Sequence, residues 1–138
     1  MGRTVLHVGP AGHGQSVKLL NNTVAAVNAA ALAEALTAGR AQGIDVDALM
    51  AVMRTGSGGS AMLELKGGPM AEHDFTPLFK LAHMLKDLRH TLEESRAPLT
   101  IARSAAALYE QAEVEGHGEE DFAAVITAAE GQLHKSQT

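Results

Sequence analysis

Apolar side chains recur at steps of three and four residues along most of this chain. The clearest run consists of Leu78, Leu81, Leu85, Leu88 and Leu92. Such spacing places side chains on one face of an α-helix. The composition agrees, because there is no Trp and aromatic residues make up only 3%, so the core must use Ala, Leu, Val and Met, which are mostly good helix formers. We therefore expect an all-α fold, a single domain of about five or six helices.

Glycine and capping residues divide the first half of the chain. A long helix is expected from about His13 to about Arg40, with Gly43 marking its end. Its apolar stripe consists of Val17, Leu20, Val24, Val27 and Ala31, typical of a face that packs against a core. Asp45 is expected to cap a shorter helix, which the Gly/Ser-rich residues 56–60 end. Residues 62–66 predict one or two further turns, broken again at 67–69.

Proline and acidic residues mark the elements of the second half. Pro77 suits the first turn of a third long helix, and Pro98 ends that helix and opens the next. Ile101, Ala105, Leu108 and Ala112 form the expected buried stripe of the fourth long helix. Gly116 and Gly118 stop it. Asp121 is expected to cap a last helix, as part of a solvated acidic approach with Glu115, Glu119 and Glu120.

Charge and composition exclude several classes of function. The net charge is −5 without a basic block, which argues against nucleic-acid binding. The chain has no cysteine, and its seven histidines form no ligand pattern such as HExxH, so no metal site is predicted. The longest apolar stretch, residues 23–33, contains Asn28 and is too short and polar to span a bilayer. With no signal peptide visible, a cytoplasmic protein is the default expectation.

The most informative segment is the glycine-rich stretch 9–22. It does not fit the phosphate-binding GxxxxGK[ST] pattern, because Gln15 occupies the lysine position. It does not fit GxGxxG either, because Val17 occupies the last glycine position. What remains is a helix start left bare by Gly14, followed by Lys18 and Asn22 one turn apart on one face. This arrangement suits a ligand site, but a surface lysine with an unrelated asparagine gives the same spacing.

The string Gly9-x-x-Gly12-x-Gly14-x-x-x-Lys18-x-x-x-Asn22 resembles the signature that opens the helical domain of β-hydroxyacid dehydrogenases, such as 3-hydroxyisobutyrate dehydrogenase and tartronate semialdehyde reductase. The resemblance implies that Lys18 is the catalytic acid/base and that Asn22 orients a small 3-hydroxyacid, with Asn21 and Gly14 lining the same site. Related 6-phosphogluconate dehydrogenases carry His-Asn at positions 21–22. Imine reductases share the fold but generally lack the lysine.

Residues 75–88 carry a second match, similar to the family's F-x-x-x-F…L-x-x-K-D-L segment. The resemblance implies that Lys86 lies near the cofactor, NAD or NADP, and that Phe79 packs there. Phe79, His83, Lys86 and His90 share one helical face by spacing, and the two histidines are expected to be ordinary exposed or half-buried residues. Asp87 is expected to hold local structure. A solvated Lys86–Asp87 charge pair is the alternative.

The resemblance covers residues 4–134 and implies the helical catalytic and dimerisation domain. Intact family members carry a Rossmann domain before it, which binds most of the cofactor, and nothing in this sequence replaces that domain. We therefore expect a helical half that is inactive alone, pairs as a homodimer through its helices and completes its site with a separate or missing Rossmann domain. The alternative is a non-catalytic dimerisation or binding module derived from the same family.

Overall fold

The fold is helical throughout the part of the chain that the computed structural model describes, residues 13–136. Its elements are α1 (His13–Ala41), α2 (Val46–Thr55), α3 (Ala61–Glu72), α4 (Leu81–Glu94), α5 (Thr100–Ala112) and α6 (Val125–Ser136), with a π-helical turn (Glu113–His117) and a 3₁₀ turn (Phe122–Ala124) between the last two. Within this range the only β-type pairing is an isolated bridge between Lys80 and Asp121. The expected all-α fold of about five or six helices is confirmed, with six α-helices in the described range.

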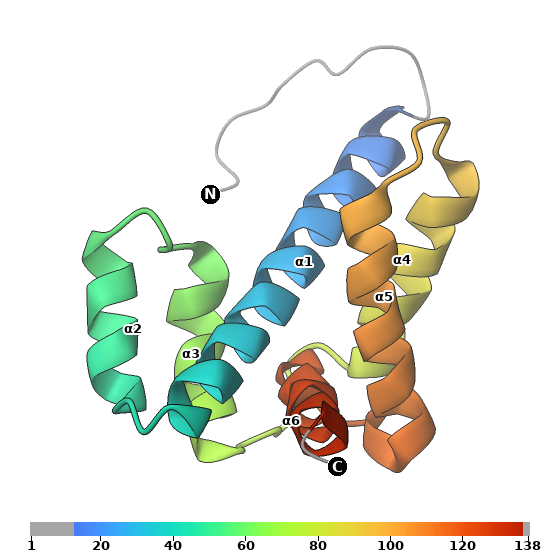
Figure 1. Ribbon diagram of the computed structural model, residues 1–138. Coiled ribbons are helices and arrows are strands. Elements are labelled where there is room, and N and C mark those ends of the chain that lie inside the picture. The colour runs from blue at the N-terminus through green and yellow to red at the C-terminus, as the bar shows by residue number, and fades with distance from the viewer. Residues whose placement is uncertain (1–12, 137–138) are drawn as a thin grey trace.

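Helix α1 is the centre of the molecule and contacts all five other α-helices. In Figure 1, α4 and α5 lie along its N-terminal half, and α2 and α3 form a hairpin beside its C-terminal half. Its buried face is lined by small residues: Ala26, Ala29, Ala30 and Ala33 are each at most 4% exposed. Small side chains let several helices approach one another closely, which explains how a chain poor in aromatics builds a dense core.

The apolar stripe expected to face the core on α1 is largely exposed, which corrects the sequence prediction. Val17 and Leu20 are each 48% exposed and Val24 is 59% exposed. The helix turns its alanines inward instead, together with Leu19 and Leu36. On a helix that is apolar over most of its surface, size alone does not identify the buried side.

Helices α2 and α3 begin as the sequence predicts. The Asp45 carboxylate accepts a hydrogen bond from the Ala48 N–H at 3.1 Å, and the Ser60 hydroxyl accepts one from the Leu63 N–H at 3.1 Å. The expected break at residues 67–69 is wrong, because α3 runs through it. Gly67 is buried there, and a Cβ added to it would lie 2.8 Å from the Met50 sulfur, so this glycine permits close packing of α3 on α2.

Helix α4 begins at Leu81, later than Pro77 predicts. Leu78, expected in the core, is 87% exposed. The cause is the segment around Asp121: the Leu81 N–H donates to the Glu120 carbonyl at 2.8 Å instead of to the Pro77 carbonyl, as a helix starting at Pro77 would require. Asp121 Oδ1 also accepts a hydrogen bond from the Leu78 N–H at 3.0 Å, so the leucine spacing becomes a core face only from Leu81 on.

The segment between α5 and α6 turns at Gly116, whose φ of 102° is a conformation that favours glycine. Asp121 then caps the 3₁₀ turn rather than α6 itself, accepting a hydrogen bond from the Ala123 N–H at 2.9 Å. Asp121 is not part of a solvated acidic cluster, since only 2% of it is exposed. Among the described residues, no helix combines the length and apolarity needed to cross a membrane.

Candidate functional site

The two residues singled out on the first helix lie one turn apart on α1. Lys18 is exposed and Asn22 is half-buried at the edge of the helix interface. Asn21 and Gly14 are exposed beside them, and within residues 13–136 no atom of another part of the chain lies within 4 Å of the position that a Gly14 Cβ would occupy.

A side-chain hydrogen bond joins the two motif segments. The Asn22 amide nitrogen donates to Oδ2 of Asp87 at 3.1 Å, across 65 residues of sequence. Both residues are partly buried, so water competes less with this bond than with one on the open surface. The fold thus brings the glycine-lysine-asparagine segment of α1 against the lysine-aspartate segment of α4. The sequence placed Asp87 beside Lys86 but did not identify Asn22 as its partner.

A second contact fixes the same pair of helices. The Thr91 hydroxyl of α4 shares its single proton between the Asp87 carbonyl of the same helix, at 3.0 Å, and the Leu19 carbonyl of α1, at 3.5 Å. Because Leu19 precedes Asn22 while Thr91 follows Asp87, the two helices run antiparallel here. The Lys18 end of α1 therefore lies beside the C-terminal half of α4.

The other candidates on the second segment are exposed but spread along α4. Lys86, His83 and His90 are all exposed. Phe79 lies before the start of α4, 36% exposed, and its ring meets those of His83 and Phe122 edge-on, with centroids 6.1 Å apart in each case. Phe79 is thus at the opposite end of α4 from the turn beside Leu19, with Lys86 between the two ends.

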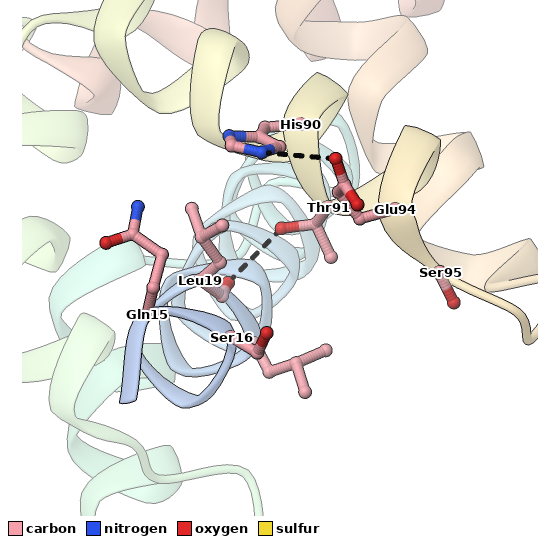
Figure 2. Close-up of a pocket in the computed structure, with 8 residues that line it drawn as sticks. Gln15, Ser16, Leu19, His90, Thr91, Glu94 and Ser95 are labelled. Carbon is pink, nitrogen blue, oxygen red and sulfur yellow. Dashed lines mark hydrogen bonds and ion pairs between the residues drawn. The ribbon is translucent and has the colours of Figure 1, made fainter. Parts of the chain in front are cut away.

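A hollow of about 360 Å³ opens between the first turns of α1 and the last turn of α4. Its lining consists of Gln15, Ser16, Leu19, Leu20, His90, Thr91, Glu94 and Ser95. Figure 2 shows the Leu19–Thr91 hydrogen bond between the two helices and the contact between His90 Nε2 and Glu94 Oε1, which are 3.6 Å apart. Lys18, Asn22, Lys86 and Asp87 are not among the lining residues. Lys18 follows Gln15 by one turn and Lys86 precedes His90 by one turn, so the two lysines lie next to the hollow and not in its wall. Its volume lies within the range of small-molecule sites.

The charges near this hollow suit an anionic ligand. Lys18 and Lys86 form no ion pair with any described residue, whereas Lys66 and Lys80 are bound to Asp121 and Glu119. An exposed ammonium group without a partner is available to a carboxylate. These two cations and the Asn22 amide suit an anionic ligand that also forms hydrogen bonds, and Glu94 places one carboxylate in the wall of the hollow. The sequence lacks a glycine fingerprint for the dinucleotide's phosphates, so their binding is not assigned to these residues.

Sequence reasoning missed the buried pair formed by Lys66 and Asp121. The Lys66 ammonium lies 3.0 Å from Asp121 Oδ2 and 4.6 Å from the centre of the Phe122 ring, and only 5% of Lys66 is exposed. Lys66 shares a face with Leu63, Gly67 and Met70, all buried at steps of three and four, so its position on the core side of α3 was readable. Nothing in the sequence identified its partner 55 residues away.

Two buried groups in this interior, Asp121 and Tyr109, have shifted pKa values. Burial of the Asp121 carboxylate raises its pKa, but hydrogen bonds from the Phe79 and Ala123 N–H groups, Lys66 and the Leu78 N–H outweigh burial and hold the pKa below its usual value. Burial, with a smaller contribution from the Asp121 charge, raises the pKa of the Tyr109 phenol. The phenol donates to the Ala26 carbonyl at 2.9 Å and so ties α5 to α1. These groups stabilise the scaffold and lie outside the hollow beside Lys18.

Comparison with known proteins agrees with the resemblance. Residues 12–129 match the family described as NAD-binding of NADP-dependent 3-hydroxyisobutyrate dehydrogenase. An L-threonate dehydrogenase of Cupriavidus necator is 37% identical over 118 residues, which are 83% of this chain and 40% of that protein. An NAD-dependent L-serine dehydrogenase of Pseudomonas aeruginosa is 34% identical over 136 residues, covering 91% of this chain and 45% of that protein.

Solved structures agree as well. A 3-hydroxyisobutyrate dehydrogenase from Salmonella typhimurium superposes with a TM-score of 0.78 at 33% identity, over 84% of this chain and 42% of that one. The Mycobacterium tuberculosis 3-hydroxyisobutyrate dehydrogenase determined with L-serine gives 0.79 at 30% identity, over 90% and 46% of the two chains. The chain spans less than half the length of each of these four proteins.

Proposed function

Since the chain belongs to the NAD(P)-dependent hydroxyacid dehydrogenase family typified by 3-hydroxyisobutyrate dehydrogenase, we propose that it is the helical half of such an enzyme, with residues 4–134 as its domain. In this proposal Lys18 exchanges the proton and Asn22 orients a small 3-hydroxyacid, with Asn21 and Gly14 beside them. The observation that supports it best is the Asn22–Asp87 hydrogen bond, which joins both family motifs beside one hollow.

In the proposed chemistry, this chain supplies the group that exchanges a proton with the substrate. A bound NAD or NADP would supply the hydride acceptor, its nicotinamide end lying toward Lys86 and Phe79. Lys18 Nζ takes the proton from the substrate's 3-hydroxyl when the alcohol is oxidised, and returns it to the carbonyl oxygen in the reverse direction. Its exposure leaves the amine accessible to substrate. Lys86 offers a positive charge to the substrate carboxylate or the cofactor.

We propose that the isolated chain turns over no hydroxyacid. Dinucleotide phosphates are held by backbone N–H groups at a glycine-rich helix start in a Rossmann domain, and the glycine-rich turn of this chain departs from that pattern at Val17. A poised lysine without a positioned hydride acceptor completes no reaction. Turnover is expected only when the chain is combined with the nucleotide-binding half of a family member.

The test is reconstitution. The chain, alone and combined with a family Rossmann domain, is assayed for nicotinamide-dependent oxidation of short 3-hydroxyacids, L-threonate and L-serine. We expect activity only in the combination, and a loss of about 10²–10⁴-fold in kcat with Lys18→Ala. Lys135→Ala, near the end of α6, is the matched control and should retain full activity. A reconstituted Lys18→Ala protein at nearly full rate would refute the role of Lys18, and an active lone chain would refute the stated need for a second half.

One observation favours a second candidate function, a non-catalytic dimerisation module. The exposed stripe of Val17, Leu20 and Val24 gives α1 an apolar face without a partner among the described residues. Pairing and catalysis are compatible, and the reconstitution experiment separates them: a module that only pairs gives no turnover with any nucleotide-binding half.

A further inference from the structure

Asn22 has a donor and an acceptor end, and which end faces a ligand determines what it recognises. An amide carries an oxygen that only accepts and a nitrogen with two N–H donors. An isolated asparagine side chain can rotate to present either end. Asp87 removes that freedom, because an ionised carboxylate has no hydrogen to donate. The amide must therefore turn its nitrogen toward Asp87, as the 3.1 Å contact has it.

Resting on the function proposed above, we propose that Asp87 is a positioning residue that fixes the polarity of Asn22 for substrate. One N–H of the amide is held by Asp87, which leaves the second N–H and the oxygen for a ligand. Together they match a hydroxyl group, which both accepts and donates a hydrogen bond. They match an apolar substituent at the same place poorly, because the amide would lose water without gaining a partner. Asp87 thus contributes to selectivity for hydroxyacids without contacting them.

The surroundings make this orientation rigid. Thr91, one turn beyond Asp87 on α4, is 4% exposed and bonds the Leu19 carbonyl three residues before Asn22. Thr23, next to Asn22 and 7% exposed, bonds the same carbonyl at 2.9 Å. The Thr91 contact crosses from α4 to α1 within one turn of both the amide and the carboxylate, whereas the Thr23 bond lies within α1. Asn22 and Asp87 are themselves half-buried, so their contact is not one between two side chains on the open surface.

The first experiment tests the orientation in the chain without ligand. The side-chain N–H₂ signals of Asn22, assigned by their disappearance in Asn22→Ala, are recorded by NMR in the wild type, Asp87→Asn and Glu93→Gln. The amide that Asp87→Asn introduces can accept from Asn22 or donate to it, so the two amides can bond in either sense. Glu93→Gln is the control, because it removes the same charge at an exposed position of α4. We expect one Asn22 side-chain proton to be shifted and protected from exchange in the wild type and in Glu93→Gln. In Asp87→Asn this shift and protection should be lost. Asn22 signals unaffected by Asp87→Asn would overturn the proposal.

The second experiment tests the consequence for binding. The same proteins are titrated with 3-hydroxypropionate and with propionate, which differ only in the hydroxyl. A well-placed hydrogen bond gives a preference of up to about tenfold for the hydroxyacid. We expect this preference in the wild type and Glu93→Gln, and a fall to about one- to threefold in Asp87→Asn and Asn22→Ala. A preference retained in Asp87→Asn but lost in Asn22→Ala would overturn the positioning role. No preference in the wild type, with the NMR signature intact, would instead contradict the proposed function.

Discussion

At the residue scale, Asp121 is the most heavily bonded side chain described. It receives hydrogen bonds from Lys66 and from the N–H groups of Leu78, Phe79 and Ala123. These contacts tie α3, the segment before α4 and the turn before α6 to one carboxylate. Replacing one member of a buried ion pair leaves its partner's charge uncompensated, which is far costlier than losing a surface pair.

We predict that Asp121→Asn lowers the free energy of unfolding by about 3–5 kcal/mol. Lys66→Met should cost less, because three backbone N–H groups still stabilise the Asp121 carboxylate. Urea unfolding of both single variants and of the double variant measures the difference. Lys80→Ala, which breaks the exposed pair with Glu119, is the control and should cost no more than about 1 kcal/mol. Equal losses in the two single variants would show that the backbone bonds contribute little.

The depressed pKa of Asp121 also predicts the pH dependence of stability. A carboxyl group whose native pKa lies below its unfolded value, about 4, binds its proton more readily when the chain is unfolded. Its contribution is therefore complete above that pH and is lost as the pH falls through the native pKa. Unfolding free energies measured from pH 7 to acid should fall more steeply for the wild type than for Asp121→Asn. Parallel curves would contradict this assignment.

At the scale of the element, the stop of α1 depends on one backbone conformation. Gly43 has a φ of 79°, which lets the Ile44 N–H turn back to the Gly39 carbonyl at 2.9 Å. We predict that Gly43→Ala destabilises the protein by about 1–2 kcal/mol, because a Cβ is strained in this region, and that Gly43→Asn costs less. Thermal or urea unfolding distinguishes the two variants. No loss with alanine would mean that the turn adopts another conformation in solution.

The positions of several helices could be predicted from the sequence, because capping and glycine residues mark their ends. The end of α1 before Gly43, the Asp45 cap and the glycine-rich break after α2 follow from local chemistry, and the structure agrees with each. The late start of α4 could not be predicted, because residues next to Asp121, far away in the sequence, bind the backbone at its start. The buried side of α1 could not be predicted either, because alanine allows several helices to pack closely at one place whereas the larger valine does not. Local patterns specify helices, whereas distant partners decide their ends and faces.

The candidate site likewise has parts that could be predicted from the sequence and parts that could not. Lys18 and Asn22 could be placed one turn apart on one face because their spacing is a property of a single helix, and their roles rest on the family resemblance. The contact between Asn22 and Asp87 and the hollow beside Thr91 could not be predicted, because both depend on how α4 lies against α1. Phe79 was assigned to the face of α4 by spacing, yet it precedes the helix and reaches His83 through a ring contact.

At the scale of the whole molecule, the exposed stripe on α1 predicts self-association. Val17, Leu20 and Val24 lie on consecutive turns and are each about half exposed. Apolar patches of this kind mark surfaces that bind a partner, and a homodimer is the commonest arrangement. We expect light scattering at tens of micromolar to give a dimer, and Val24→Asp to give a monomer with its circular dichroism unchanged. A wild-type monomer at that concentration would contradict the prediction.

The Lys66–Asp121 pair has a consequence for the order in which the chain can be completed during synthesis. The lysine leaves the ribosome 55 residues before its carboxylate partner, and chains emerge at roughly 5–20 residues per second. For several seconds α3 therefore carries a charge that cannot be buried without large cost, and the N–H groups before α4 lack their acceptor. Until Asp121 emerges, the first three helices cannot close against the rest. The packing of the first three helices thus depends on the segment that contains Asp121, and a nascent chain arrested before this segment should remain sensitive to proteases.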